Sequence, residues 1–222
     1  MSIIPIRSLS EIDFTNIDEN TLVIWDLDDT TFVPKNRVMR NINNQYKKSL
    51  LSQLSNEEIS QLYQNYKNIL IEPILVEIIK DLIYKNIPTI ALTTRETGYR
   101  LQTCSTTFQE QTLKSLNELN IKFLSHYNDQ NFQSIHSNNN NYNDNVVFTN
   151  NISKGVLLKE LFSIWKPSYI IMIDDKLSNL NELSKFDINY TGYLYSGFED
   201  IDNSVDDSMV NEYINKIKNG NY

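Results

Sequence analysis

The chain has 222 residues, 40% of them hydrophobic, and this length suits a single domain over residues 1–222, with or without an insert. Its formal net charge of −8 argues against a nucleic-acid partner, because phosphate backbones would be repelled by the average surface. A single cysteine, Cys104, excludes an intrachain disulfide. No stretch reaches the ~18 apolar residues of a membrane span. No basic region followed by a long apolar run opens the chain, so we expect a cytoplasmic protein, with signal-independent secretion left open.

The first predicted strand is the apolar run Leu22-Val23-Ile24-Trp25, which ends abruptly at Asp26. Its length and its β-branched residues favour a buried strand. Apolar residues then recur at helical spacing between residues 35 and 68, which predicts two helices, the second beginning near Ser55. After these we predict, in chain order, a helix over 74–84, a strand over 87–92, a helix over 108–119 and a short strand over 121–124.

A run of asparagine over residues 138–145 predicts a loop in the second half of the chain, within a loop or β insert over 125–146. The rest of the pattern predicts a strand over 146–148, a helix that Ser153 caps and that ends near residue 165, strands over 169–173 and 190–195, and a helix over 209–217. Alternating strands and helices indicate an α/β fold, with a Rossmann-like parallel sheet flanked by helices.

Polar residues stand at the ends of three predicted strands. They are Asp26, Thr93 and Asp174. In parallel α/β sheets, ligands bind at the carboxyl ends of the strands. We therefore expect these three residues to belong to one site.

Asp26 and Asp28 are two residues apart at a strand end, so their side chains can face the same pocket. A carboxylate can attack phosphorus and form an aspartyl-phosphate. A second carboxylate beside it can donate a proton to the leaving oxygen and later activate water, if its neighbour raises its pKa. The alternative is an acidic turn that caps the next element.

Asp174 and Asp175 end another apolar run. Brought close to the first pair of aspartates, they would form a cluster of carboxylates that is unfavourable without a cation. Magnesium fits best, because it accepts one or two carboxylates together with phosphate oxygens and water. Asn179 follows closely and is a candidate for orienting a carboxylate. A plain acidic surface turn is the alternative.

Two further residues are candidates for binding phosphate. The hydroxyl of Thr93 can donate a hydrogen bond to a phosphoryl oxygen. Lys154 lies at the start of a predicted helix, where a cation is unfavourable because it opposes the helix dipole. A lysine at this position therefore suggests a functional role. In that role, the Lys154 ammonium would neutralise a phosphoryl group and the Asp26 carboxylate. The alternatives are an ordinary strand-end threonine and a solvated lysine.

The order of these motifs resembles that of the haloacid dehalogenase (HAD) superfamily. The motifs are Asp-x-Asp-x-Thr over residues 26–30, then Thr93, then Lys154, then the pair Asp174-Asp175. The resemblance implies a Rossmann-like fold, a magnesium ion and a phosphorylated substrate. It makes Asp26 look like the nucleophile and Asp28 like the general acid and base. The metal ligands that it implies are Asp26, Asp174 and the backbone carbonyl of Asp28, with Asp175 and Asn179 as supporting residues. It also implies that Thr93 and Lys154 bind the phosphate.

A narrower resemblance links the chain to the DUF2608 family, a bacterial group placed among HAD phosphatases. It rests on the segments Leu92-Thr93-Thr94-Arg95, Lys154-Gly155 and Ile173-Asp174-Asp175-Lys176-Leu177. This resemblance refines the fold more than the substrate.

The superfamily includes several activities, and Asp28 favours phosphoester chemistry over dehalogenation. We predict a magnesium-dependent phosphoric monoester hydrolase. A phosphomutase, a phosphoprotein phosphatase and a catalytically weak interaction protein remain as alternatives. Residues 33–72 lie where one class of cap is inserted, and a cap would contact the leaving group. Candidate substrate contacts are Arg95 and, in this helical insert, Lys35, Arg37, Arg40 and Tyr46. The sequence indicates neither the substrate nor the oligomeric state.

Overall fold

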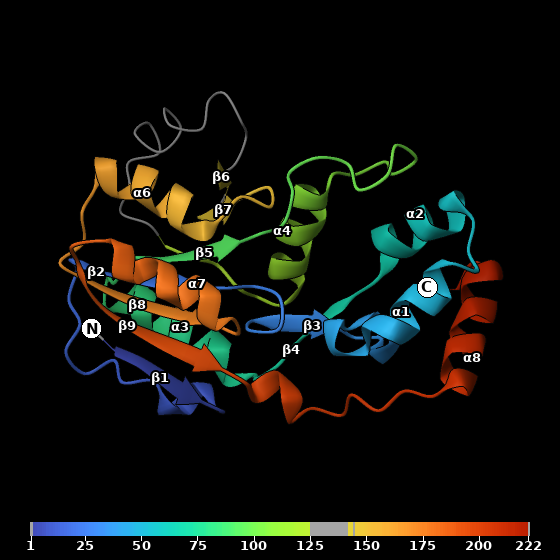
Figure 1. Ribbon diagram of the computed structural model, residues 1–222, viewed down its shortest axis with the longest axis horizontal. Helices are drawn as coiled ribbons and strands as arrows, with labels where there is room; N and C mark the ends of the chain where they lie inside the picture. Colours follow the sequence, from blue (N-terminus) through green and yellow to red (C-terminus); the bar gives the residue numbers. More distant parts are fainter. Residues whose placement is uncertain (1, 125–141, 144, 222) are drawn as a thin grey trace.

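The computed structural model describes residues 2–124, 142–143 and 145–221. Most of the predicted insert over 125–146 lies outside the described residues. In the described part, a sheet of seven strands forms the core of the larger part of the molecule (Figure 1). Six neighbouring strands are parallel, and β6 at one edge is antiparallel to β7. The spatial order is β1 (Ser2–Ile6), β9 (Asn189–Tyr195), β8 (Tyr169–Asp174), β2 (Thr21–Trp25), β5 (Thr89–Thr93), β7 (Val146–Phe148) and β6 (Tyr142–Asn143).

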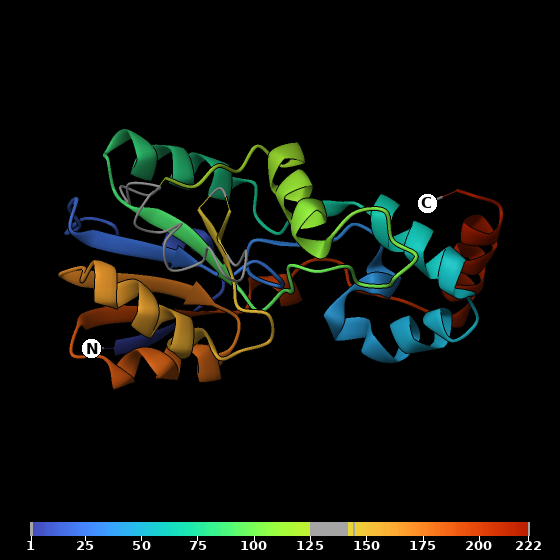
Figure 2. The same cartoon turned by 90° about the horizontal axis from the view of Figure 1, so that it is seen from above.

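Helices cover both faces of this sheet, which confirms the predicted α/β architecture. On one face lie α3 (Ile74–Tyr84) and α4 (Phe108–Glu118), and on the other α6 (Lys154–Ile164) and α7 (Leu177–Glu182) (Figure 2). Burial on both faces of the sheet explains the apolar run over residues 22–25 in β2. Its residues Val23 and Trp25 pack with the first helix pair, whereas Leu22 and Ile24 pack with the second. A strand buried on both faces has no polar side to alternate with.

A smaller helical lobe lies at one end of the molecule (Figure 1). An antiparallel pair of short strands, β3 (Phe32–Pro34) and β4 (Asn68–Leu70), connects it to the rest of the structure. Between them lie two 3-10 turns (Arg37–Met39 and Asn41–Asn43), α1 (Asn44–Leu51) and α2 (Asn56–Asn65). Helix α8 (Asp207–Lys218) completes the lobe, because its apolar residues join those of α1 and α2 in one buried cluster. We call α1, α2 and α8, with the two 3-10 turns, the helical lobe.

Several predicted elements need correction. Residues 121–124 form no strand, and only Leu124 makes an isolated bridge, to Thr89. Strand β1 was not predicted. Ser153 does not cap α6 with its side chain; its hydroxyl donates instead to the Glu182 carboxylate at 2.5 Å. None of the described helices has both the length and the apolar character that crossing a membrane requires.

Candidate functional site

The pairing of β2 with β8 brings the two predicted strand-end aspartates together. Trp25 is in register with Ile173, so each strand reaches its aspartate at the next residue. The backbone N–H of Asp26 donates to the carbonyl of Ile173 at 2.9 Å, which extends the ladder by one bond. Asp26 and Asp174 are therefore neighbours at the carboxyl edge of the sheet, and both are buried.

Lys154 joins these two carboxylates. It is the first residue of α6 and is only 1% exposed. Its Nζ donates to Asp26 Oδ1 at 2.5 Å and to Asp174 Oδ2 at 2.6 Å. The ammonium group of Lys154 therefore forms ion pairs within the acidic cluster and is not hydrated. Burial lowers the pKa of Lys154, but the negative charges of Asp26 and Asp174 outweigh burial. The pKa of Lys154 therefore lies above its ordinary value.

A third carboxylate, Asp175, completes a cluster that fits a metal ion. One oxygen from each of Asp26, Asp174 and Asp175 lies within 4.8 Å of the other two. Two buried oxygens of this cluster, Asp26 Oδ2 and Asp175 Oδ1, have no hydrogen-bond partner among the described residues. A buried carboxylate oxygen without a donor is costly, and a hard divalent cation relieves that cost. The donor set therefore fits a hard divalent cation.

Asp174 is the most firmly held member of the cluster. Asn179 Nδ2 donates to its two carboxylate oxygens at 2.9 and 3.0 Å, and the backbone N–H of Lys176 donates to Oδ1 at 2.9 Å. Lys154 is a further donor. Asn179 thus contacts a carboxylate and fixes its orientation. Its supporting role at a metal site stays a prediction.

Burial dominates the electrostatics of the cluster. It raises the pKa of Asp26 well above the ordinary value, Lys154 opposes the rise, and the charges of Asp174 and Asp175 add to it. Burial likewise raises the pKa of Asp175, to about 7. A bound dication would favour the ionised form of both groups.

Asp28 does not join the cluster through its side chain. Its two oxygens accept hydrogen bonds from Arg95 at 2.7 and 2.8 Å, a bidentate ion pair. Burial of Asp28 would raise its pKa, but the Arg95 guanidinium outweighs burial and holds that pKa below the ordinary value. The predicted acid and base role of Asp28 requires a raised pKa, and the ion pair with Arg95 works against that condition. Nothing in the sequence indicates that Arg95 reaches Asp28.

Thr93 ends β5, the strand on the other side of β2. Its buried hydroxyl accepts a weak hydrogen bond, 3.3 Å long, from the backbone N–H of Arg95. Its position at the same edge of the sheet is the predicted one. Its role in binding phosphate stays a prediction.

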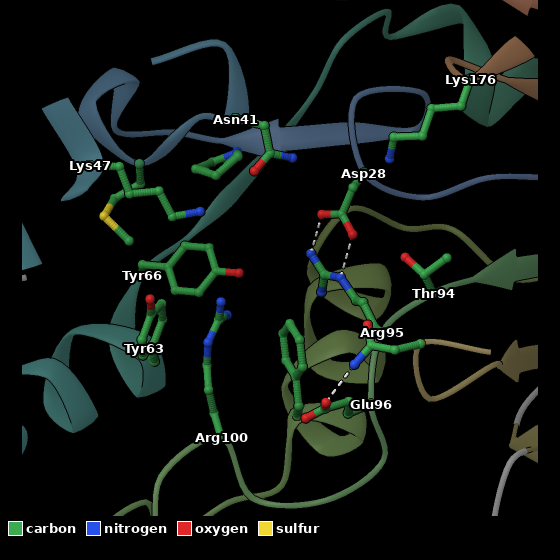
Figure 3. Close-up of a pocket in the computed structure, with 14 residues that line it drawn as sticks. Asp28, Asn41, Lys47, Tyr63, Tyr66, Thr94, Arg95, Glu96, Arg100 and Lys176 are labelled. Carbon is green, nitrogen blue, oxygen red and sulfur yellow. Dashed lines mark hydrogen bonds and ion pairs between the residues drawn. The ribbon is translucent and has the colours of Figure 1, made fainter. Parts of the chain in front are cut away.

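A cavity of about 310 Å³ opens beside Asp28, between the sheet and the helical lobe (Figure 3). Its charged lining is unusual for so acidic a protein, because four cationic side chains accompany two carboxylates. The cations are Lys47, Arg95, Arg100 and Lys176, and the carboxylates are Asp28 and Glu96.

Three of these cations, Lys47, Arg100 and Lys176, were not among the site residues predicted from the sequence, although Lys176 belongs to a segment that carries the narrower resemblance. Two expected contacts, Arg37 and Arg40, lie elsewhere. Arg40 is buried, and its Nη1 donates to the backbone carbonyl of Asp202 at 2.6 Å. Arg37 forms an ion pair with the Asp202 carboxylate at 2.7 Å. Both arginines therefore tie the helical lobe to the chain that leads into α8.

The other two expected contacts, Lys35 and Tyr46, do not line the cavity either. Tyr46 packs against the apolar cluster of the helical lobe. No signal in the sequence separated Lys47 from these neighbours, because the choice depends on how α1 is turned.

The fold and the site define the class of this protein: an α/β protein with a candidate metal site of three carboxylates at the carboxyl ends of its parallel strands. More narrowly, the chain belongs to the DUF2608 family, described as a protein family of unknown function, which matches residues 5–219. The match confirms the narrower of the two family resemblances and includes the helical lobe with α8. A comparison with curated proteins finds no match to this chain.

Proposed function

We propose that this protein is a magnesium-dependent phosphatase of the HAD type, which hydrolyses a phosphomonoester through an aspartyl-phosphate on Asp26. One observation carries the proposal. Asp26 Oδ1 is held by Lys154, while Asp26 Oδ2 is buried without a donor in the described structure. A carboxylate anchored by one oxygen and free at the other is suited both to nucleophilic attack and to binding a cation.

The residues around Asp26 would have separate roles in phosphoryl transfer: some would bind the metal, and others would bind the phosphoryl group. Asp26 and Asp174, with Asp175 in support and the backbone carbonyl of Asp28, would hold Mg²⁺, which when bound neutralises charge on the phosphoryl oxygens. Lys154 would neutralise further charge on the phosphoryl group and on Asp26. Thr93 would donate its hydroxyl to a phosphoryl oxygen.

Asp28 would move the protons. As Asp26 forms its bond to phosphorus, the bond to the leaving oxygen breaks, and Asp28 gives that oxygen a proton. Asp28 then takes a proton from the water that attacks the aspartyl-phosphate, which releases phosphate and restores both carboxyl groups. The ion pair with Arg95 favours the ionised carboxylate, so Asp28 must leave Arg95, or share it with substrate, to carry a proton.

The proposal is tested by hydrolysis of p-nitrophenyl phosphate with Mg²⁺ and with EDTA. We expect turnover that requires the metal and that falls by about 10⁶-fold in Asp26→Asn, the scale on which loss of the nucleophile acts in covalent catalysis. The control is Asp187→Asn, an exposed aspartate shortly before β9, at the opposite edge of the sheet from the cluster. Its turnover should equal that of the parent protein.

Other outcomes select other functions. Normal turnover by Asp26→Asn would overturn the assignment of the nucleophile. Absent or metal-independent turnover by folded protein would favour an interaction protein that keeps only the fold. A phosphomutase would retain the phosphoryl group, so steady release of phosphate favours the hydrolase. The cavity volume of about 310 Å³ favours a small phosphorylated molecule over a phosphoprotein.

A further inference from the structure

Two cations face the cavity without an acidic partner. Lys47 comes from α1, and Arg100 comes from the segment between β5 and α4. Both side chains are half-buried. In the part of the chain that the structure describes, neither forms an ion pair, whereas Arg95 on the same cavity is paired with Asp28.

Their proximity is electrostatically unfavourable as it stands. Burial lowers the pKa of Lys47, and the positive charge of Arg100 lowers it further, with only partial relief from Asp28 and Asp29. Arg100 is held in place by aromatic rings, since its guanidinium carbon lies 3.8 Å from the centre of the Tyr63 ring and 4.7 Å from that of Phe108. Two like charges are thus held near each other with no ion-pair partner among the described residues, and Asp28 and Asp29 offset them only in part.

The donors of this region converge. In Figure 3 the Lys47 amine, the Tyr66 hydroxyl and the Arg100 guanidinium all point into the cavity, on the side that faces the Asp28–Arg95 pair. They come from α1, from the end of α2 and from the segment before α4. The exposed carboxylate of Glu96 is engaged by Asn151, whose Nδ2 donates to it at 2.6 Å. Cations and a hydroxyl with no carboxylate between them form a site for an anion.

We propose that Lys47 and Arg100 bind a second anionic group of the substrate, a carboxylate or a second phosphoryl group. The substrate is then a small phosphomonoester with an anion at its other end. This inference rests on the proposed function, because Asp26 and the metal cluster define where the first phosphoryl group binds. The helical lobe selects the substrate by charge at the end remote from the reaction.

The test uses non-hydrolysable ligands. Phosphonoalkanoates of increasing chain length carry a phosphonate at one end and a carboxylate at the other, and alkylphosphonates of equal length lack the carboxylate. Dissociation constants are measured by calorimetry at saturating Mg²⁺. At the best length we expect the phosphonoalkanoate to bind about tenfold more tightly, the contribution of one charge-assisted hydrogen bond. Bisphosphonates of matched length show whether a second phosphoryl group is preferred to a carboxylate.

Substitutions assign the effect to the two cations. Lys47→Met keeps the alkyl stem and removes the charge, and it should reduce the tenfold preference to about twofold or less. Lys48→Met alters the next residue of α1, which is exposed, and should leave the preference intact. Arg100→Gln is the second variant and should behave as Lys47→Met does.

Two outcomes would contradict the proposed second anion site. Equal binding of both ligand series at every length, or a preference that survives in Lys47→Met and in Arg100→Gln, would overturn the inference. Calorimetry needs no turnover, so this failure is distinct from failure of the phosphatase proposal, which is read from p-nitrophenyl phosphate.

Discussion

Lys154 shows how one side chain organises the acidic edge of the sheet. Its ammonium is fully buried and has two carboxylate partners, Asp26 and Asp174. Removing one partner of a buried ion pair leaves an uncompensated charge, so each of the three depends on the others. The cluster as described still carries more negative than positive charge, because Asp175 adds a third carboxylate. The stability of the metal-free protein should therefore depend on pH.

Asp175 provides that pH test. Burial raises its pKa from 3.8 to about 7, so between these values the folded protein keeps a proton that the unfolded chain has lost. Stability is then lost as the pH rises toward 7. In EDTA, we expect the free energy of unfolding by urea to fall between about pH 5 and about pH 7, and to fall less steeply in Asp175→Asn.

The remaining slope in Asp175→Asn should come from Asp26, whose pKa is also raised. Added Mg²⁺ should reverse the trend, because the ion binds the ionised carboxylates. Asp187→Asn, an exposed site, should follow the parent protein. Parallel pH profiles for the parent and Asp175→Asn would show that Asp175 is not the titrating group.

Site residues were predictable where the chain itself fixes their position. Asp26 follows β2 directly and Asp174 is the last residue of β8. The rule that parallel strands end at one edge brings the two together. Other contacts depend on side-chain packing across segments far apart in sequence. Examples are the ion pair of Asp28 with Arg95 and the proximity of Lys47 to Arg100. No local pattern carries that information.

Helix α8 is the element whose role differs most from expectation. Its sequence predicted an amphipathic helix over 209–217, and the structure gives it a partner, the helical lobe. Ile214 of α8 packs with Leu50 and Leu62 in the buried cluster of the lobe. The lobe is thus built from two parts of the chain that lie far apart in sequence.

Ile214→Ala measures this packing. Removing a buried isoleucine costs about 2–5 kcal/mol in the free energy of unfolding, through lost burial and the cavity left behind. Asn211→Ala, on the exposed side of the same helix, should change stability by about 0.5 kcal/mol or less. Urea unfolding of both variants gives the comparison, and an equal effect of the two would show that α8 does not pack on the lobe.

Element predictions succeeded where sequence signals are local. Ser55 and Glu58 form the capping box that starts α2, and Pro73 precedes α3 directly. Strand β1 was missed because it is an edge strand in which only Ile6 is buried, and Pro5 interrupts the pattern. Residues 121–124 were read as a strand because Ile121 and Phe123 are apolar, yet these side chains fill the core after α4 without pairing into the sheet.

At the scale of the molecule, the carboxylate cluster and the two cations Lys47 and Arg100 belong to different parts of the structure. The cavity lies between these parts, and Asp28 and Lys176 line it from the sheet. The carboxylate cluster belongs to the sheet, whose apolar residues form two clusters of their own. Lys47 belongs to the helical lobe, which has a separate cluster. Arg100 lies on the segment over 94–107, which contacts α2 through Ser105, whose hydroxyl donates to Gln64 Oε1 at 3.2 Å. A ligand with two anionic ends would therefore bridge the sheet and the lobe.

Hydrogen exchange can separate the responses of these two parts. With Mg²⁺ alone, we expect slower amide exchange near the carboxylates, over residues 26–31, 153–156 and 174–180, because the ion binds only to the sheet. Adding a phosphonoalkanoate of the best length should slow exchange in α1 and over 94–107 as well. The corresponding alkylphosphonate should protect the sheet segments and leave α1 unchanged. If Mg²⁺ alone slowed exchange in α1 as strongly as in residues 174–180, the sheet and the helical lobe would respond as one cooperative unit, and the bridging role of the ligand would have no support.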